Sequence, residues 1–186
     1  MSNFPISLNL ENKKILVIGA GKIATSKIKK LLDFTKNIVV LAPNISDELE
    51  KLNIKTLKKR YEKSDIENFH IVIACIDDIN LQREIYKHTR EKNILYNCVD
   101  IYELCDFTFS SIIKKDDLVI TISTSGASPS FSKELKKYLE KIIPNNVGSF
   151  LKNMKNLRAT MPKGEERMEI LRKKSKEFIS SIKSIK

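Results

Sequence analysis

Gly19, Gly21 and Ala24 have the spacing that most clearly indicates chemistry, in the stretch Gly-Ala-Gly-Lys-Ile-Ala. They follow an apolar run, residues 14–18, that predicts a buried strand. In a strand–turn–helix unit, such glycines permit the tight turn and let the backbone approach a pyrophosphate, and the N–H groups of the helix N-terminus bind the phosphates. A purely structural turn is the alternative. The position after the first strand favours dinucleotide binding.

One part of that pattern is missing. NAD-binding units usually place an acid about 20 residues further on, against the ribose. Residues 41–44 read Leu-Ala-Pro-Asn, and Asp47 suits the first turn of the next helix better. Pro43 and Asn44 are therefore the candidates at this place, and the amide of Asn44 could bind the ribose. These residues leave NAD and NADP open.

Acidic residues follow two later apolar runs. Asp77 and Asp78 end the run 70–76, and Asp100 follows the run 94–99. Ligands of open parallel sheets bind beyond the carboxyl ends of strands. We expect one of the adjacent pair to cap a helix and the other, Asp77, to face the cofactor. Asp100 could take up a proton, help bind a metal or cap a turn.

A loop rich in hydroxyl groups, Ser-Thr-Ser-Gly-Ala-Ser-Pro-Ser, occupies residues 123–130. It could bind an anion through N–H and O–H donors, or simply cap the next helix. No histidine lies near it in sequence, which argues against serine hydrolase chemistry. His70 and His88 are expected to be structural.

The elements that must position these residues alternate between strand and helix. Strand-like runs lie at 14–18, 37–43, 54–57, 70–76 and 94–99. A helix begins at Lys22, a short one follows the second run, and a third extends from Asp77 to about Lys92 with Leu81, Ile85 and His88 along one face. This alternation predicts an α/β fold with a parallel, doubly wound sheet.

The pattern changes after Asp106. Residues 107–125 carry two strand-like runs separated by Lys-Lys-Asp-Asp, which predicts an antiparallel hairpin. A helix is predicted at 130–143, ended by Pro144, and the remainder is helical. A narrow apolar seam on the last helix is expected to pack on the chain itself or on a second subunit; its members are Met168, Leu171, Ser175, Phe178, Ile182 and Ile185.

Composition restricts the class of protein. The chain has 186 residues and a net charge of +11. No apolar run reaches the roughly 18 residues of a membrane span, and the first residues lack the pattern of a secretory signal. The three cysteines are odd in number and lack zinc spacing, so we expect a reducing, cytoplasmic compartment and no bound metal. The charge fits an anionic ligand, but dispersed lysines and the absence of tryptophan do not favour nucleic acid.

In order along residues 4–145, the chain resembles the precorrin-2 dehydrogenase family, the dehydrogenase and ferrochelatase part of siroheme synthases. The matching stretches are FPISLNLENKKILVIGAGKIATSK, VVLAP, ACIDDINLQREI, NCVD, CDFTFSSII and LVITISTSGASPSFSKELKKYLE. Departures from the family pattern are modest and concern Ala20, Ile76, Cys98, Ser110 and Ser125. Ser125 stands where a glycine is common, and a glycine with positive φ would be hard to replace.

This resemblance implies NAD-dependent oxidation of precorrin-2, a polycarboxylate tetrapyrrole, to sirohydrochlorin in sirohaem biosynthesis. Some members also insert Fe2+ to form sirohaem, and the residues do not decide whether this chain does. The family's implicated aspartate corresponds to Asp100. The family's cofactor contacts correspond to Gly21, Lys22, Ile23, Pro43 and Asn44, to which the glycine turn and the end of the run 70–76 add Gly19 and Asp77. The expected substrate contacts are Asn97, Ser123, Ser125, Gly126 and Ser128.

The resemblance also implies a domain organisation. We expect a Rossmann-like NAD-binding domain at 1–113, a dimerisation segment of strand and helix at 114–146, and a helical C-terminal domain at 147–186. Members of the family form homodimers through the segment after the nucleotide domain. The alternative is a dinucleotide-sensing dimeric module with a basic, DNA-binding helical tail.

Overall fold

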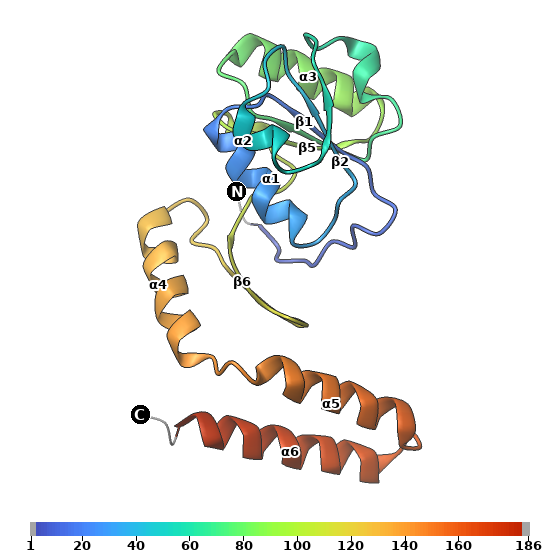
Figure 1. Ribbon diagram of the computed structural model, residues 1–186, viewed down its shortest axis with the longest axis vertical. Helices are drawn as coiled ribbons and strands as arrows, with labels where there is room; N and C mark the ends of the chain where they lie inside the picture. Colours follow the sequence, from blue (N-terminus) through green and yellow to red (C-terminus); the bar gives the residue numbers. More distant parts are fainter. Residues whose placement is uncertain (1–2, 184–186) are drawn as a thin grey trace. The chain divides into compact units, whose positions relative to one another are not determined.

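The computed structural model describes residues 3–183 and forms two compact units that divide between Phe109 and Ser110 (Figure 1). The first unit contains a five-stranded parallel sheet in the order β3-β2-β1-β4-β5. The predicted α/β fold with a parallel sheet is therefore confirmed. Its elements are β1 Ile15–Ile18, α1 Lys22–Leu32, β2 Ile38–Leu41, α2 Asp47–Glu50, β3 Lys55–Leu57, β4 Ile71–Ala74, α3 Ile79–Glu91 and β5 Leu95–Cys98.

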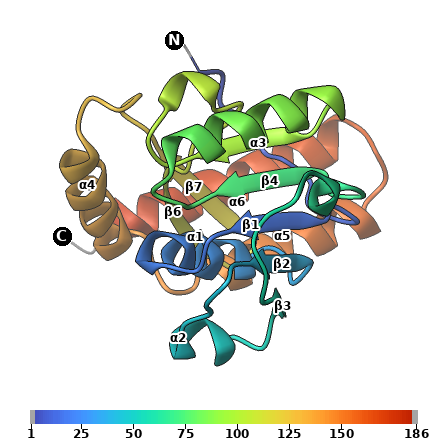
Figure 2. The ribbon, with the colours of Figure 1, turned by 90° about the horizontal axis from the view of Figure 1, so that it is seen from above.

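Two apolar layers hold this sheet between its helices. Every residue of β1 and β4 is buried, which explains their continuous apolar runs. Ala24 and Ile28 of α1 pack into one layer and Ile85 of α3 into the other. Figure 1 shows α3 and α1 on opposite sides of the sheet, and Figure 2 looks onto the sheet from the side of α3. The sheet is thus covered by a helix on each face.

The face of α3 that is most deeply buried differs from the predicted one. Gln82, Ile85 and Thr89 are fully buried, whereas His88 is half-buried and its Nδ1 lies 3.0 Å from the Tyr61 hydroxyl. The predicted face, Leu81, Ile85 and His88, shares only Ile85 with this set, so the prediction missed two polar residues on the inner face. Two 3₁₀ turns, η1 at Lys63–Ile66 and η2 at Tyr102–Leu104, were also not predicted.

The second unit begins with the predicted antiparallel hairpin. Its strands are β6 Ser111–Lys115 and β7 Leu118–Ile122, joined at Asp116, which has a φ of +52°. Helix α4, Pro129–Ile142, packs on the hairpin. Lys115 Nζ donates to the carbonyl of Ile143 over 2.7 Å and so ties the hairpin to the end of α4.

The C-terminal part of the second unit is two helices, α5 Val147–Thr160 and α6 Glu165–Lys183. The predicted seam lies on α6, and part of it packs on α5: Leu171 is buried and the ring centroids of Phe150 and Phe178 are 4.1 Å apart, whereas Met168 is 54% exposed. Ile185 lies outside the described residues. The proposed separation of 147–186 as its own domain stays a prediction, because packing within a chain does not show which parts fold alone.

No helix between residues 3 and 183 combines the length and the apolar character that crossing a bilayer would require.

Candidate functional site

The segments that follow β1, β2 and β4 are joined by backbone hydrogen bonds at the carboxyl edge of the sheet. The N–H of Gly19 donates to Leu41 O over 2.8 Å, and the N–H of Cys75 donates to Ile18 O over 2.7 Å. Because the strands are parallel and adjacent, the residues just beyond them share this edge. The predicted glycine turn, the Pro43–Asn44 pair and Asp77 therefore belong to one region of the first unit.

Gly19 is required by the structure itself. Its φ is +104°, and a Cβ built there would lie 2.1 Å from the carbonyl oxygen of Cys75. Any side chain would therefore collide with the backbone after β4. This close approach explains the first glycine of the motif without invoking a ligand.

Gly21 is different, because nothing in the protein requires it to be glycine. Its φ of −78° suits any residue, and a Cβ at this position would meet no atom within 4 Å. Gly21 is the N-cap of α1 and supplies no side-chain cap, so the first N–H groups of the helix remain available. Lys22 and Ile23 beside it are exposed, with 53% of Ile23 accessible. Open space beside uncapped N–H groups fits the approach of a pyrophosphate.

The two adjacent acids after β4 have separate places. Asp78 caps α3, since its Oδ1 accepts a hydrogen bond from Leu81 N over 3.0 Å. Asp77 is exposed, as are Pro43 and Asn44 after β2. This division matches the expectation that one acid caps the helix and the other remains available to a ligand.

Asp100 is an exposed carboxylate just beyond β5, held from one side. Its Oδ2 accepts a 2.7 Å hydrogen bond from Nε2 of Gln82, and the same Nε2 donates to Ile76 O over 2.7 Å. Gln82 is fully buried in α3, so it fixes one oxygen of Asp100 to the body of the unit. The N-cap of the following turn η2 is Ile101, which argues against a helix-capping role for Asp100.

Sequence reasoning missed Gln82. Its only signal was a polar residue on the buried face of α3, at the spacing of Ile85 and Thr89. The Oε1 of Gln82 is buried and has no hydrogen-bond partner within the described residues. A buried oxygen left unpaired costs about 1–3 kcal/mol, and the amide keeps this orientation because its NH2 group faces two acceptors.

Asn97 lies inside the first unit rather than at its surface. It is 4% exposed, its Oδ1 accepts from Lys27 Nζ over 2.5 Å, and its Nδ2 donates to Phe107 O over 2.8 Å. The Lys27 ammonium also lies 4.9 Å from the centre of the Phe109 ring. Burial lowers the pKa of Lys27 below its usual value. Asn97 therefore links α1 to the segment that leaves β5.

The predicted serine loop lies in the second unit, where it caps α4. Ser128 is the N-cap and its Oγ accepts from Phe131 N over 3.2 Å, while the Oγ of Ser123 accepts from Ser125 N over 3.2 Å. Ser125 has a φ of +50° and Gly126 a φ of +87°. Ser125 thus adopts the conformation that favours glycine. Capping uses the acceptor oxygens, and a hydroxyl that accepts still has one proton to donate.

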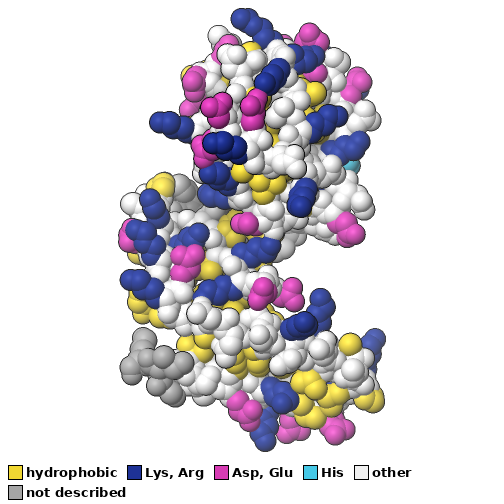
Figure 3. Space-filling view, in the orientation of Figure 1, with side chains coloured by type: hydrophobic (Ala, Val, Ile, Leu, Met, Phe, Trp, Pro, Cys, Tyr) yellow, Lys and Arg dark blue, Asp and Glu magenta, His cyan; other side chains and the backbone are white. Residues whose placement is uncertain are grey.

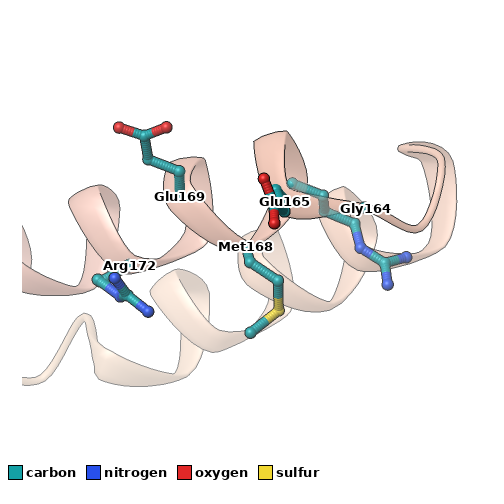
Figure 4. Close-up of a pocket in the computed structure, with 6 residues that line it drawn as sticks. Gly164, Glu165, Met168, Glu169 and Arg172 are labelled. Carbon is teal, nitrogen blue, oxygen red and sulfur yellow. The ribbon is translucent and has the colours of Figure 1, made fainter.

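A surface hollow lies in the second unit, and none of its lining residues is a predicted site residue. It is lined by α6 and the turn before it, with Glu165, Met168, Glu169 and Arg172 among its residues. Figure 4 shows Glu169 and Met168 pointing in opposite directions, so these side chains do not converge on a ligand. Within residues 3–183, no three His, Cys, Asp or Glu side chains gather in a way that could hold a metal ion.

Comparisons with known sequences agree with the predicted cofactor region. Residues 6–111 match the family model described as "Putative NAD(P)-binding". A siroheme synthase of Psychrobacter arcticus is 34% identical over 156 residues, which is 82% of this chain and 28% of that protein. The "Probable multifunctional siroheme biosynthesis protein HemA" of Ruminiclostridium josui is 37% identical over 144 residues, 75% of this chain and 28% of that protein. This chain thus corresponds to less than a third of either relative.

A solved structure has the same fold over nearly the whole chain. It is "SirC, precorrin-2 dehydrogenase", with a TM-score of 0.80 and 22% sequence identity, covering 98% of this chain and all of that one. The likeness includes the helical C-terminal part and confirms the predicted fold. The siroheme synthase relatives confirm the resemblance noted along residues 4–145.

Proposed function

The chain belongs to the NAD(P)-binding family whose model covers residues 6–111, and we propose that it oxidises precorrin-2 to sirohydrochlorin with NAD+ in sirohaem biosynthesis. The observation that carries the proposal is an exposed carboxylate, Asp100, held at the same sheet edge as the uncapped glycine turn. The siroheme synthases that match most of this chain, and the fold of the precorrin-2 dehydrogenase, support it.

The residues of the first unit have separate roles in this proposal. Gly21, Lys22 and Ile23 would hold the pyrophosphate through N–H groups of α1, with Gly19 shaping the turn and Pro43, Asn44 and Asp77 bordering the bound nucleotide. Bound NAD+ supplies the hydride acceptor. Loss of hydride leaves the macrocycle cationic, so a proton must leave it, and the carboxylate of Asp100 accepts that proton or stabilises the positive charge. Gln82 holds one carboxylate oxygen of Asp100 in place.

Polycarboxylate binding is assigned to donors in the second unit. Ser123, Ser125 and Ser128 would supply hydroxyl donors and Gly126 an N–H donor near the N-terminus of α4, where negative charge is favoured. For Asn97 the same role would require it to exchange one of its two internal hydrogen bonds. Ser123→Ala should therefore raise the KM for precorrin-2 and leave the Kd for NAD+ unchanged. Equal changes in both constants would contradict the assignment.

The test of the reaction is a spectroscopic assay with purified precorrin-2 and NAD+. Asp100→Ala should lower turnover roughly a hundredfold to ten-thousandfold, the usual contribution of a positioned acid or base. Glu103→Ala removes another exposed acid from the same loop and should leave turnover unchanged. An Asp100→Ala enzyme with full turnover would remove the proposed role, and a wild-type enzyme without product would remove the proposed reaction.

We also propose NAD+ rather than NADP+ as the cofactor, as the family resemblance implies, although residues 41–44 carry neither an acid for the ribose nor an arginine for a 2′-phosphate. Titration with both nucleotides decides this: NAD+ should bind more tightly, and a preference for NADP+ would reverse the proposal.

Fe2+ is a second candidate substrate, with Asp100 serving both reactions. Adding Fe2+ and sirohydrochlorin without NAD+ should yield sirohaem faster than the uncatalysed rate if the chain is bifunctional. No rate above that background would restrict the chain to the dehydrogenase reaction.

A homodimer in a reducing, cytoplasmic compartment completes the proposal. Exposed apolar residues Phe131, Tyr138 and Ile142 lie along α4 at spacings that place them on one side of the helix. Sedimentation should give twice the chain mass, and Tyr138→Lys should shift the chain towards the monomer. The nucleotide-sensing alternative rested on the basic charge and on the apolar seam of α6, of which Leu171 is buried and Phe178 stacks on Phe150 of α5.

A further inference from the structure

Two free thiols face each other around the loop that carries Asp100. The Sγ atoms of Cys98 and Cys105 are 3.8 Å apart, and both cysteines are free. Cys98 is the last residue of β5 and is 5% exposed, whereas Cys105 follows η2 and is half-buried. A third cysteine, Cys75, is also free and serves as an internal comparison.

The base of this loop is fixed, which keeps the two sulfurs close. Asp106 N donates to Tyr96 O over 2.8 Å, and the Asp106 carboxylate accepts from Tyr96 N over 2.8 Å. Arg90 pairs with the same carboxylate and donates to Ile94 O over 2.6 Å. Cys98 N in turn donates to Cys105 Sγ over 3.3 Å. The two sulfurs are 3.8 Å apart and must approach to the disulfide bond length of about 2 Å. With the base of the loop fixed, we expect side-chain rotation to bring them together.

We propose that Cys98 and Cys105 are a modification site, a dithiol that peroxides oxidise to an intramolecular disulfide around Asp100. The more accessible Cys105 thiolate attacks hydrogen peroxide: an S–O bond forms, the O–O bond breaks, and hydroxide leaves and becomes water. The Cys98 sulfur then attacks Cys105, so that an S–S bond forms, the S–O bond breaks, and hydroxide leaves as water with the Cys98 proton. The two sulfurs lose two electrons and the peroxide gains them. Burial raises the pKa of Cys98 to about 11, which fits its role as the second thiol to react.

The disulfide would act on the residue next to Asp100. The Cys98 thiol donates to the carbonyl of Ile101 over 3.2 Å, and the single proton of Cys105 has two acceptors in reach, the carbonyl of Cys98 at 3.5 Å and that of Ile101 at 3.6 Å. Oxidation removes both protons, so the carbonyl of Ile101 loses its Cys98 donor while the loop gains a covalent closure. Asp100, which immediately precedes Ile101, then changes position relative to Gln82. This consequence for turnover rests on the proposed function, whereas formation of the disulfide does not.

The chain offers a sharp chemical test. Trypsin releases Cys98 and Cys105 within one peptide, residues 93–114, because no lysine or arginine lies between them. A protease that cuts after Glu103 separates the two cysteines, so only a disulfide keeps the pieces together without reductant. After mild exposure of the full chain to hydrogen peroxide, this linked product should appear and titratable thiols should fall from three to one.

Matched variants distinguish this pair from other thiols. Cys75→Ser should still form the linked product, with its thiols falling from two to none. Cys98→Val should form no linked product, and Cys105→Ala provides a second test if the valine variant does not fold. Retention of all three thiols in the wild type, or a disulfide to Cys75 or between chains, would overturn the site.

Turnover is measured separately on the same samples. Peroxide should lower wild-type turnover, a dithiol reductant should restore it, and Cys98→Val should be insensitive to both. If the disulfide forms and turnover does not change, the effect on Asp100 is refuted. A wild type with no turnover before oxidation would count against the proposed function, and the thiol titration would still decide the disulfide.

Discussion

The two glycines of the turn after β1 have different roles: Gly19 is needed for the fold, and Gly21 is proposed to be needed for cofactor binding. Gly19→Ala places a Cβ 2.1 Å from a backbone oxygen at positive φ, so we expect severe destabilisation in chemical denaturation. Gly21→Ala enters open space, so stability should change by no more than about 1 kcal/mol. Its NAD+ affinity, measured by titration, should fall roughly tenfold or more, because about 1.4 kcal/mol is a tenfold change. Unchanged affinity would show that no phosphate approaches Gly21.

Gln82 is proposed to position Asp100. Gln82→Met removes the donor at similar volume, so kcat should fall roughly tenfold to a hundredfold, the effect of a misplaced reacting group, with the KM for NAD+ little changed. In the Asp100→Ala background the same change should lower kcat no further, because the carboxylate it orients is gone. Steady-state kinetics of the single and double variants checks this. An additive loss would mean that Gln82 acts through the fold instead.

Lys27 should make stability depend on pH. Because burial lowers its pKa in the folded chain, the unfolded chain binds more protons between that lowered pKa and 10.5. The free energy of unfolding therefore increases as pH rises from the lowered pKa to 10.5, and the contribution of Lys27 is fully present above 10.5. It is lost as pH falls through the pKa of the folded chain. Denaturation curves from neutral pH towards 10.5 should rise less steeply for Lys27→Met than for wild type. Identical slopes would contradict this.

At the residue scale, the sequence pattern located the site residues that directly follow a strand, and it missed a buried residue of the helix that packs beside them. Asp100 and the glycine turn were predictable because parallel strands place their following residues at one edge. Gln82 was not, because its contact with Asp100 depends on how α3 packs beside β5. Asn97 was expected to contact substrate, and its hydrogen bonds with Lys27 and Phe107 show that its side chain is engaged inside the first unit.

At the element scale, the alternation of strand and helix was sufficient to predict the fold of the first unit. Continuous apolar runs are typical of strands that are buried on both faces, as in a parallel sheet covered by helices. The break between α5 and α6 was not anticipated. It falls at Met161–Gly164, where Pro162 and Gly164 end the helical run. Arg167 then donates to Arg158 O over 3.1 Å and stabilises the end of α5.

The hairpin and α5 also meet at one glycine of the second unit. A Cβ on Gly148 would lie 1.7 Å from Oδ2 of Asp116. Gly148→Ala should therefore destabilise the chain by about 1–3 kcal/mol, the usual effect of overpacking. Asp116→Gly removes the colliding carboxylate and suits the positive φ, so the double variant should recover most of the loss in thermal melting. No recovery would place the cost elsewhere.

At the scale of the whole molecule, the net charge of +11 bears on a polyanionic substrate. Figure 3 shows Lys and Arg side chains interspersed with Asp and Glu on the visible face, without a single basic stripe. A net positive charge spread in this way attracts a polycarboxylate from a distance. Salt weakens this attraction, because the Debye length is about 8 Å at physiological ionic strength. The KM for precorrin-2 should rise with added salt, whereas kcat should not. A KM independent of salt would argue against steering by charge.

Gly19 and Gly148, the two glycines at which a Cβ would collide with a neighbouring atom, should differ in how they vary among homologues. The obstacle at Gly148 is a side chain, so a larger residue there can be accepted once position 116 has become smaller, and the two positions are expected to vary together among homologues. The obstacle at Gly19 is a backbone oxygen that no substitution removes. Gly19 has no second position able to compensate for its loss, so lineages that lose it should be those that have also abandoned the turn.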